Sequence, residues 1–193
     1  MEVATRSAYI YSKSRDFHKL ISHGKIAARR KKAIVSAYLF GAGLFQCGTW
    51  AELSAKSYTK LHHYIMSVYR NIYHQCFEDV DTMAADNWII DKYQLISPIG
   101  FVRVARLQLA NRMLNKNNTA LLDICRHCLA HDVGWAHSVK DDLSWLSQAE
   151  FCKFDCNQLC TESMGSIVTQ KSFGRKLIQW AKECPANQFA PNK

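Results

Sequence analysis

The stretch YTKLHHYIMSVYRNI, residues 58–72, is the most regular amphipathic segment of this 193-residue chain. Large apolar side chains recur along it at steps of three and four, at Tyr58, Leu61, Ile65, Val68 and Ile72. An α-helix collects such positions on one face and leaves the polar side chains on the other. The spacing therefore predicts a helix that buries its apolar face against neighbouring helices.

Helical spacing continues on both sides of this segment. Further helices are expected to begin at or near Phe17, Ile34, Pro98, Thr119, Trp135 and Ser172. The start at Ser97-Pro98 is favourable because Ser caps a helix and Pro fits its first turn. The chain has only 8 Gly and 3 Pro, too few turn residues for a many-stranded sheet. We predict an all-α helical bundle with no sheet.

The composition is that of a globular protein with its own core. Hydrophobic residues make up 48% of the chain and charged residues 21%. Trp50 and Trp88 stand near apolar positions at the ends of helical stretches, and both are expected to anchor the core. The helical region is predicted to occupy residues 1–150. A cysteine-containing helical appendage with a frayed tail is predicted for residues 151–193.

The sequence also indicates a compartment. No apolar stretch reaches the roughly 18 residues that a membrane span requires, and residues 1–17 lack the apolar core of a secretory signal. Eight cysteines at uneven spacing then indicate reduced thiols rather than a disulfide framework. A cytoplasmic or nuclear protein without a membrane partner is expected.

The net charge of +9 is concentrated in the first third of the chain. Residues 1–70 contain 12 lysines and arginines against three acidic residues, whereas the other 123 residues contain 13 of each. A basic patch of this kind attracts nucleic acid first and an acidic membrane surface second. A solvated basic face that binds no partner is the alternative.

Seven basic residues are the predicted nucleic-acid contacts, because they lie in or beside the densest part of this patch. They are Arg29, Arg30, Lys31 and Lys32, followed by Lys25, Lys19 and Arg15. Contacts from Lys and Arg to phosphate supply affinity and register without reading the base sequence. The sequence does not separate the seven, because a helix exposes only some of its residues on any one side.

Motifs of catalytic sites are missing from the sequence. There is no Gly-rich phosphate loop, nucleophile elbow or HExxH motif. The Asp141-Asp142 pair has the residue type with which polymerases hold two metal ions. It lies, however, in a helical stretch between Trp135 and Trp145, so we interpret it as helix surface. The chain is predicted to have no catalytic residues and no enzymatic activity of its own.

Cysteine and histidine residues gather in the second half of the chain. Cys125, Cys128 and His131 are spaced three apart, and Cys152, Cys156 and Cys160 four apart. Zinc needs four converging ligands, whereas residues three apart on a helix drift around its axis. We therefore predict buried thiols, with no metal site and no cofactor. A zinc site built from Cys125, Cys128, Cys156 and Cys160 is the alternative.

Several short motifs follow one another in a recognisable order. They are Phe17-x-x-Leu20, Lys31-x-x-Ile34-x-x-Ala37-Tyr38-Leu39, Thr49-Trp50, Leu61…Tyr69-Arg70, Pro98-x-x-Phe101…Ala105-Arg106-Leu107 and Trp135-x-x-x-Val139-x-x-Asp142-Leu143-x-Trp145-Leu146. In this order they resemble the region that follows the catalytic palm in LINE-type, non-LTR retrotransposon reverse transcriptases. The resemblance covers residues 5–148. Ala37 stands where that family has Ser, and Phe40-Gly41 replaces an aliphatic residue and Tyr.

The resemblance implies a fragment of an RNA-directed DNA polymerase. Its expected role is that of a thumb, which grips an RNA/DNA template–primer duplex by phosphate contacts and has no catalytic centre. The expected partners are this duplex and the palm and fingers that the chain lacks, and Mg²⁺ is expected only in the palm. A free-standing helical domain that binds nucleic acid or protein is the alternative function, followed by a small cysteine-rich metalloprotein.

Overall fold

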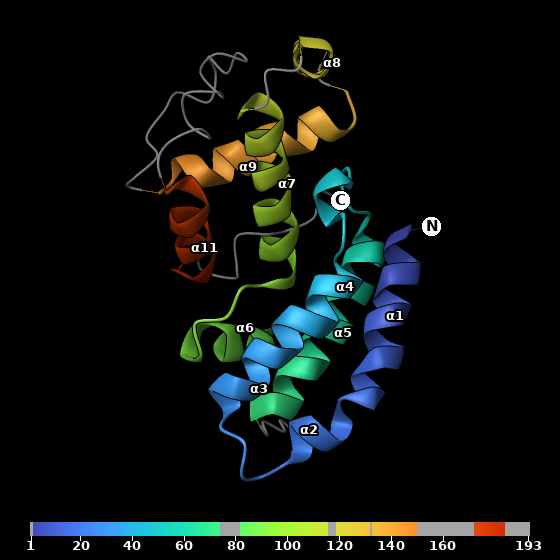
Figure 1. The fold of residues 1–193 in the computed structure, drawn as a ribbon, viewed down its shortest axis with the longest axis vertical. Coiled ribbons are helices and arrows are strands. Elements are labelled where there is room, and N and C mark those ends of the chain that lie inside the picture. Colours follow the sequence, from blue (N-terminus) through green and yellow to red (C-terminus); the bar gives the residue numbers. More distant parts are fainter. Residues whose placement is uncertain (1, 74–81, 116–118, 132, 150–171, 184–193) are drawn as a thin grey trace. The chain divides into compact units, whose positions relative to one another are not determined.

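The structure is a computed structural model that describes residues 2–73, 82–115, 119–131, 133–149 and 172–183. Within these ranges the chain is helical and has no strand, which confirms the predicted all-α fold. The helices form two compact units (Figure 1). The N-terminal unit contains residues 2–45, 53–73 and 82–99, and the C-terminal unit contains residues 46–52 and the described residues from 100 onward.

In the N-terminal unit, the predicted amphipathic segment forms the central helix. The helices are α1 (Glu2–Asp16), α2 (His18–Ser22), α3 (Ala28–Ile34), the π-helix η1 (Val35–Phe40), α4 (Gly41–Gly43), α5 (Ala55–Tyr73) and α6 (Thr82–Lys92). Helices α1, α2, α3 and α6 all contact α5. The apolar face of α5 is buried as predicted, with Leu61 and Ile65 fully inaccessible to solvent.

Residues 28–43 form one continuous helical rod in which α3 leads through the π-helical turn η1 into α4. Its inner side packs on α1 and α5, and the ring of Phe40 meets the ring of Tyr69 edge-on at 5.5 Å between centroids. At the end of the rod Gly43 lies against the side chain of Ile10. A methyl group at this position would overlap Ile10, so the close approach of α4 and α1 depends on glycine.

The C-terminal unit is built around two long helices. It contains the 3-10 turn η2 (Cys47–Thr49), most of α7 (Pro98–Asn115), α8 (Thr119–Ala130), α9 (Trp135–Ser147) and α11 (Phe173–Glu183). Helices α7, α8 and α9 begin at Pro98, Thr119 and Trp135, as the sequence predicts. The core contains Leu107, Leu143 and Leu177, which are all fully buried.

The predicted appendage is described only in part. Residues 150–171 and 184–193 lie outside the described residues, and so do Cys152, Cys156, Cys160 and the predicted frayed tail. Helix α11 belongs to the predicted appendage, but it groups with α7 and α9 in the C-terminal unit. Its Trp180 ring lies 6.2 Å from the ring of Trp145 on α9. Among the described helices, none has both the length and the apolarity needed to cross a membrane.

Candidate nucleic-acid interface

Five of the seven predicted contact residues are exposed on the N-terminal unit. They are Arg15 at the end of α1, Lys19 on α2, Lys25 in the following turn, and Arg29 and Arg30 in the first turn of α3. The end of α1, α2 and the start of α3 lie together at one end of this unit (Figure 1). We call these five residues the basic end.

No described residue forms an ion pair with any of the five side chains of the basic end. The acidic residue of this region, Asp16, is already bound by Lys13 at 2.9 Å. Glu2, at the other end of α1, lies 3.8 Å from Arg6. The charges of the basic end are therefore not neutralised within the described structure and are available to an external anion.

The other two predicted contact residues are held within the protein. Lys31 is only 2% exposed, because α3 turns it toward the core. Its side chain is therefore not placed to meet a phosphate. Lys31 is accordingly removed from the predicted nucleic-acid contacts. Lys32 is half-buried, and its Nζ donates a hydrogen bond of 3.4 Å to the carbonyl oxygen of Gln94. This contact joins α3 to the segment that follows α6.

A group of four residues at the ends of α5 and α6 was not predicted from the sequence. We call it the aromatic cluster; its members are Tyr73, Trp88, Lys92 and Tyr93. The rings of Tyr73 and Tyr93 are stacked, with 3.8 Å between centroids and 15° between planes. Trp88 meets Tyr93 edge-on, and Nζ of Lys92 lies 4.1 Å from the centre of the Trp88 ring.

Trp88 is 42% exposed, so it does not anchor the core as predicted, whereas Trp50 at 5% does. Burial and the neighbouring Tyr93 raise the pKa of Tyr73 above its ordinary value, so its phenol is neutral at pH 7. The cluster thus combines neutral rings with an ammonium group. Its sequence signal was Tyr73 as the last residue of α5 and Tyr93 as the first residue after α6, together with Trp88.

A buried polar network fixes α6 on α5 and so positions the aromatic cluster. Asp86, 1% exposed, accepts hydrogen bonds from Nε and Nη2 of Arg70 at 2.8 and 2.5 Å. Its other oxygen lies 3.0 Å from Nε2 of His62, whose Nδ1 lies 3.3 Å from the Tyr58 hydroxyl. Arg70 binds both oxygens of the carboxylate, so the network has a structural role and holds α6 against α5. His62 is therefore a buried packing residue of α5.

In the C-terminal unit, Asp142 is the centre of a buried ion pair. Nε and Nη2 of Arg106 donate to its two oxygens at 2.6 and 2.9 Å, and Arg103 lies 3.6 Å away. Burial raises the pKa of Asp142 to about 6 against the opposing effect of the two arginines, so the group is ionised at pH 7. Asp142 is 1% exposed, which corrects the interpretation of the Asp141-Asp142 pair as helix surface. Asp141 alone is exposed.

Three of the motifs that carry the family resemblance meet around this ion pair. Nη1 of Arg106 lies 3.3 Å from the carbonyl oxygen of Trp50, beside the Thr49-Trp50 motif. Nε1 of Trp135 donates to the carbonyl oxygen of Gly48 at 2.5 Å. A Cβ on Gly48 would lie 2.6 Å from the carbonyl oxygen of Ala105, so η2 sits directly on the backbone of α7.

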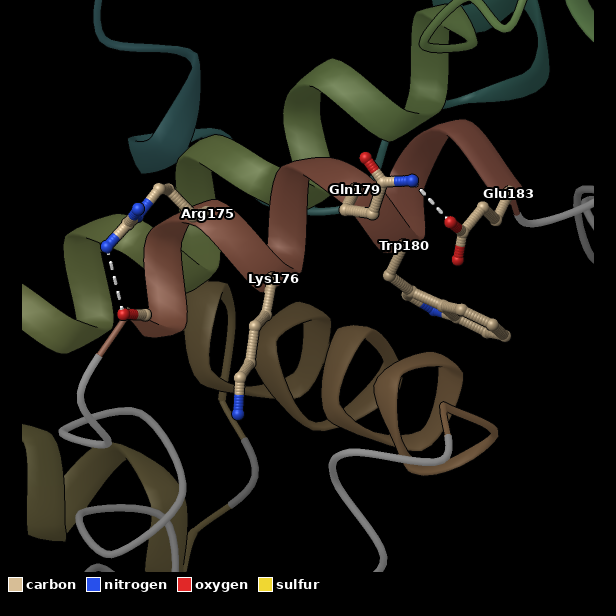
Figure 2. Close-up of a pocket in the computed structure, with 6 residues that line it drawn as sticks. Arg175, Lys176, Gln179, Trp180 and Glu183 are labelled. Carbon is tan, nitrogen blue, oxygen red and sulfur yellow. Dashed lines mark hydrogen bonds between the residues drawn. The ribbon is translucent and has the colours of Figure 1, made fainter.

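A pocket of about 450 Å³ runs along α11. It is lined by Ser172, Arg175, Lys176, Gln179, Trp180 and Glu183 (Figure 2). Arg175 donates to the hydroxyl of Ser172 at 3.2 Å, and Gln179 donates to Glu183. This lining offers no pair of nucleophile and base.

The described residues contain no group of three or more His, Cys, Asp or Glu side chains arranged to hold a metal ion. Cys47 is buried, and burial raises the pKa of its thiol to about 11, while Cys128 is a half-buried free thiol. The other ligands of the alternative zinc site are not described.

Comparisons of the chain with models of protein families, with curated proteins and with solved structures found no match.

Proposed function

We propose that this chain is the thumb-like region of a non-LTR retrotransposon reverse transcriptase, and that its N-terminal unit grips a template–primer duplex by phosphate contacts. The observation that carries the proposal is the basic end: five exposed cations without an ion-pair partner among the described residues. Contacts of this kind hold a duplex in register without selecting its sequence. The catalytic palm and fingers would be supplied by a different part of the polymerase.

The position of Arg29 and Arg30 supports a phosphate partner. Both lie in the first turn of α3, which contains no acidic residue. The N-terminal end of a helix is itself positive, so two arginines there cost about 0.3–1 kcal/mol each. A bound phosphate removes this repulsion, and its oxygens accept the bidentate hydrogen bonds that guanidinium groups donate.

The contacts between the family-like motifs support the resemblance itself. Thr49-Trp50, Ala105-Arg106-Leu107 and the segment from Trp135 to Asp142 are far apart in sequence but share one set of buried contacts. Motif residues that define a fold are expected to contact one another. The same ion pair favours a region without its own catalytic centre, because Arg106 binds both oxygens of Asp142 and leaves none for a metal ion.

A paired comparison of arginine and lysine variants tests the proposal. In the full chain, the double variant Arg29→Gln, Arg30→Gln should weaken binding to an RNA–DNA duplex measured by fluorescence anisotropy. It should also flatten the slope of log K against log salt, by about 0.9 per lost contact on the scale of B-form DNA. Duplexes of unrelated sequence should be affected equally.

The matched control is Lys56→Gln, Lys60→Gln, which removes two exposed charges from α5 of the same unit. It should leave the slope nearly unchanged. Equal losses from both double variants would mean that only total charge matters, and the basic end would not be the site.

A protein-interaction domain is the second candidate function, and one observation favours it. The outer side of η1 and α4, continued by Phe45 just after α4, exposes an apolar stripe made of Tyr38, Gly41, Ala42 and Phe45. Tyr38 is 69% exposed and Phe45 is 59% exposed. If neither double variant changes duplex binding, this candidate takes precedence.

A further inference from the structure

The aromatic cluster has no role in the phosphate contacts proposed above. The stacked rings of Tyr73 and Tyr93 lie beside the exposed indole of Trp88, with the ammonium group of Lys92 on the indole face. Its place is fixed, because the buried carboxylate of Asp86 on α6 is held by Arg70 and His62 on α5. Of the three rings only that of Trp88 is exposed, and Tyr73 and Tyr93 are half-buried. A flat exposed ring next to a cationic side chain is an element with which proteins bind unpaired bases.

The cluster lies close to the first turn of α3. Lys32 contacts the carbonyl oxygen of Gln94, the residue after Tyr93, and Arg29 and Arg30 precede Lys32 by less than one helical turn. Phosphates held by these arginines would therefore lie near the aromatic cluster. Asp91 is an exposed acidic side chain of α6, but Lys92 lies on the Trp88 ring and Lys32 reaches Gln94. Arg29 and Arg30 add two more cations in the turn before Lys32.

We propose that the aromatic cluster stacks an unpaired base of the nucleic acid whose backbone is held at Arg29 and Arg30. This inference rests on the proposed binding of duplex phosphates by the basic end, which we call the duplex grip. It adds a substrate class: a duplex that carries a single-stranded extension. The extension leaves the duplex over α3, and its base displaces Lys92 from the face of Trp88. The released ammonium group then meets a phosphate of the same strand.

The test compares two substrates in the full chain, a blunt RNA–DNA duplex and the same duplex with a short single-stranded extension. The wild type should bind the extended duplex more tightly. Trp88→Ala should weaken binding of the extended duplex by roughly 5- to 150-fold, the usual effect of losing one aromatic stacking partner. Binding of the blunt duplex and its salt slope should not change, because Trp88 makes no contact with that substrate in this proposal.

The control variant is Phe45→Ala, which removes another exposed aromatic ring from the N-terminal unit, 59% exposed and outside the cluster. It should leave binding of both substrates unchanged. Photo-crosslinking supplies a second readout on the wild type in case Trp88→Ala does not fold. An extension that carries 5-iodouracil should form its adduct on Trp88 or Tyr93, and adducts found only elsewhere would overturn the proposal.

The two proposals fail in different ways. If Trp88→Ala affects both substrates alike or neither, while Arg29→Gln, Arg30→Gln weakens both, the stacking site is wrong and the duplex grip stands. If Trp88→Ala weakens only the extended duplex and the arginine variant changes nothing, the base stacks on the cluster, but its backbone is not held at Arg29 and Arg30 and the duplex grip is wrong.

Discussion

The ion pair between Arg106 and Asp142 joins residues 36 positions apart and excludes both from solvent. Such a pair contributes little compared with apolar residues that fill the same space, but the loss of one partner is costly. The charge that is left behind remains buried without compensation. In this chain, the carbonyl oxygens of Trp50 and Ala51 would also lose a nearby donor.

Arg106→Met should lower the free energy of unfolding by about 3–5 kcal/mol, measured by urea denaturation at pH 8. The loss should be smaller at pH 5. Without Arg106, which lowers the pKa of Asp142, this pKa rises further above its ordinary value. A raised pKa in the folded state favours folding at low pH, and this advantage is lost as pH rises through that pKa.

Arg112→Met is the matched control, because Arg112 is exposed on the same helix. It should change stability by no more than about 0.5 kcal/mol at either pH. Equal losses from the two substitutions, or a loss at Arg106 that does not depend on pH, would contradict the assigned role of the ion pair.

Side-chain burial at single positions was only partly predictable. Asp142 lies three residues after Val139 and just before Leu143, so it stands on the buried face of α9, and this spacing could have identified it. Lys31 stands three and four residues before Ile34 and Val35, so the same spacing places it toward the buried side, although its charge favours an exposed position. How completely it is buried depends on how α5 packs on α3, which the local sequence does not specify.

At the scale of elements, prediction succeeded where a helix buries a continuous apolar stripe. Helix α5 buries such a stripe, and its sequence was sufficient to predict it. Helix α1 was not predicted, because it buries only Ser7 and Ile10 and its pattern is weak. In α6 the buried face includes a charged residue, Asp86, which interrupts the apolar pattern, so this helix and the aromatic cluster at its end were missed.

The contact of η2 with α7 allows a test of this packing. Gly48→Ala should destabilise the protein by about 1–3 kcal/mol, because the added methyl group would meet the backbone carbonyl of Ala105, which cannot rotate away. Gly24→Ala is the control, since nothing lies within 4 Å of the position that its Cβ would take. It should leave stability unchanged or raise it by about 0.4–1 kcal/mol. Thermal unfolding of both variants makes the comparison, and equal stability would show that η2 does not pack on α7 this closely.

At the scale of the whole molecule, both proposed functions reside in the N-terminal unit. The basic end and the aromatic cluster are each formed by helices of this unit, so neither depends on how the two units are arranged. The concentration of charge in residues 1–70 was predictable from the sequence. The distribution of that charge over exposed and buried positions was not, because it depends on how α1, α2 and α3 pack on α5.

Chemical modification of arginine tests the duplex grip most directly. An arginine-selective glyoxal reagent would be applied to the full chain, free and bound to an RNA–DNA duplex, and the modified residues would be identified by mass spectrometry. The duplex should protect Arg15, Arg29 and Arg30 but leave the reactivity of Arg112 and Arg175, exposed on the C-terminal unit, unchanged. Protection of Arg112 and Arg175 with continued reactivity of Arg29 and Arg30 would contradict it.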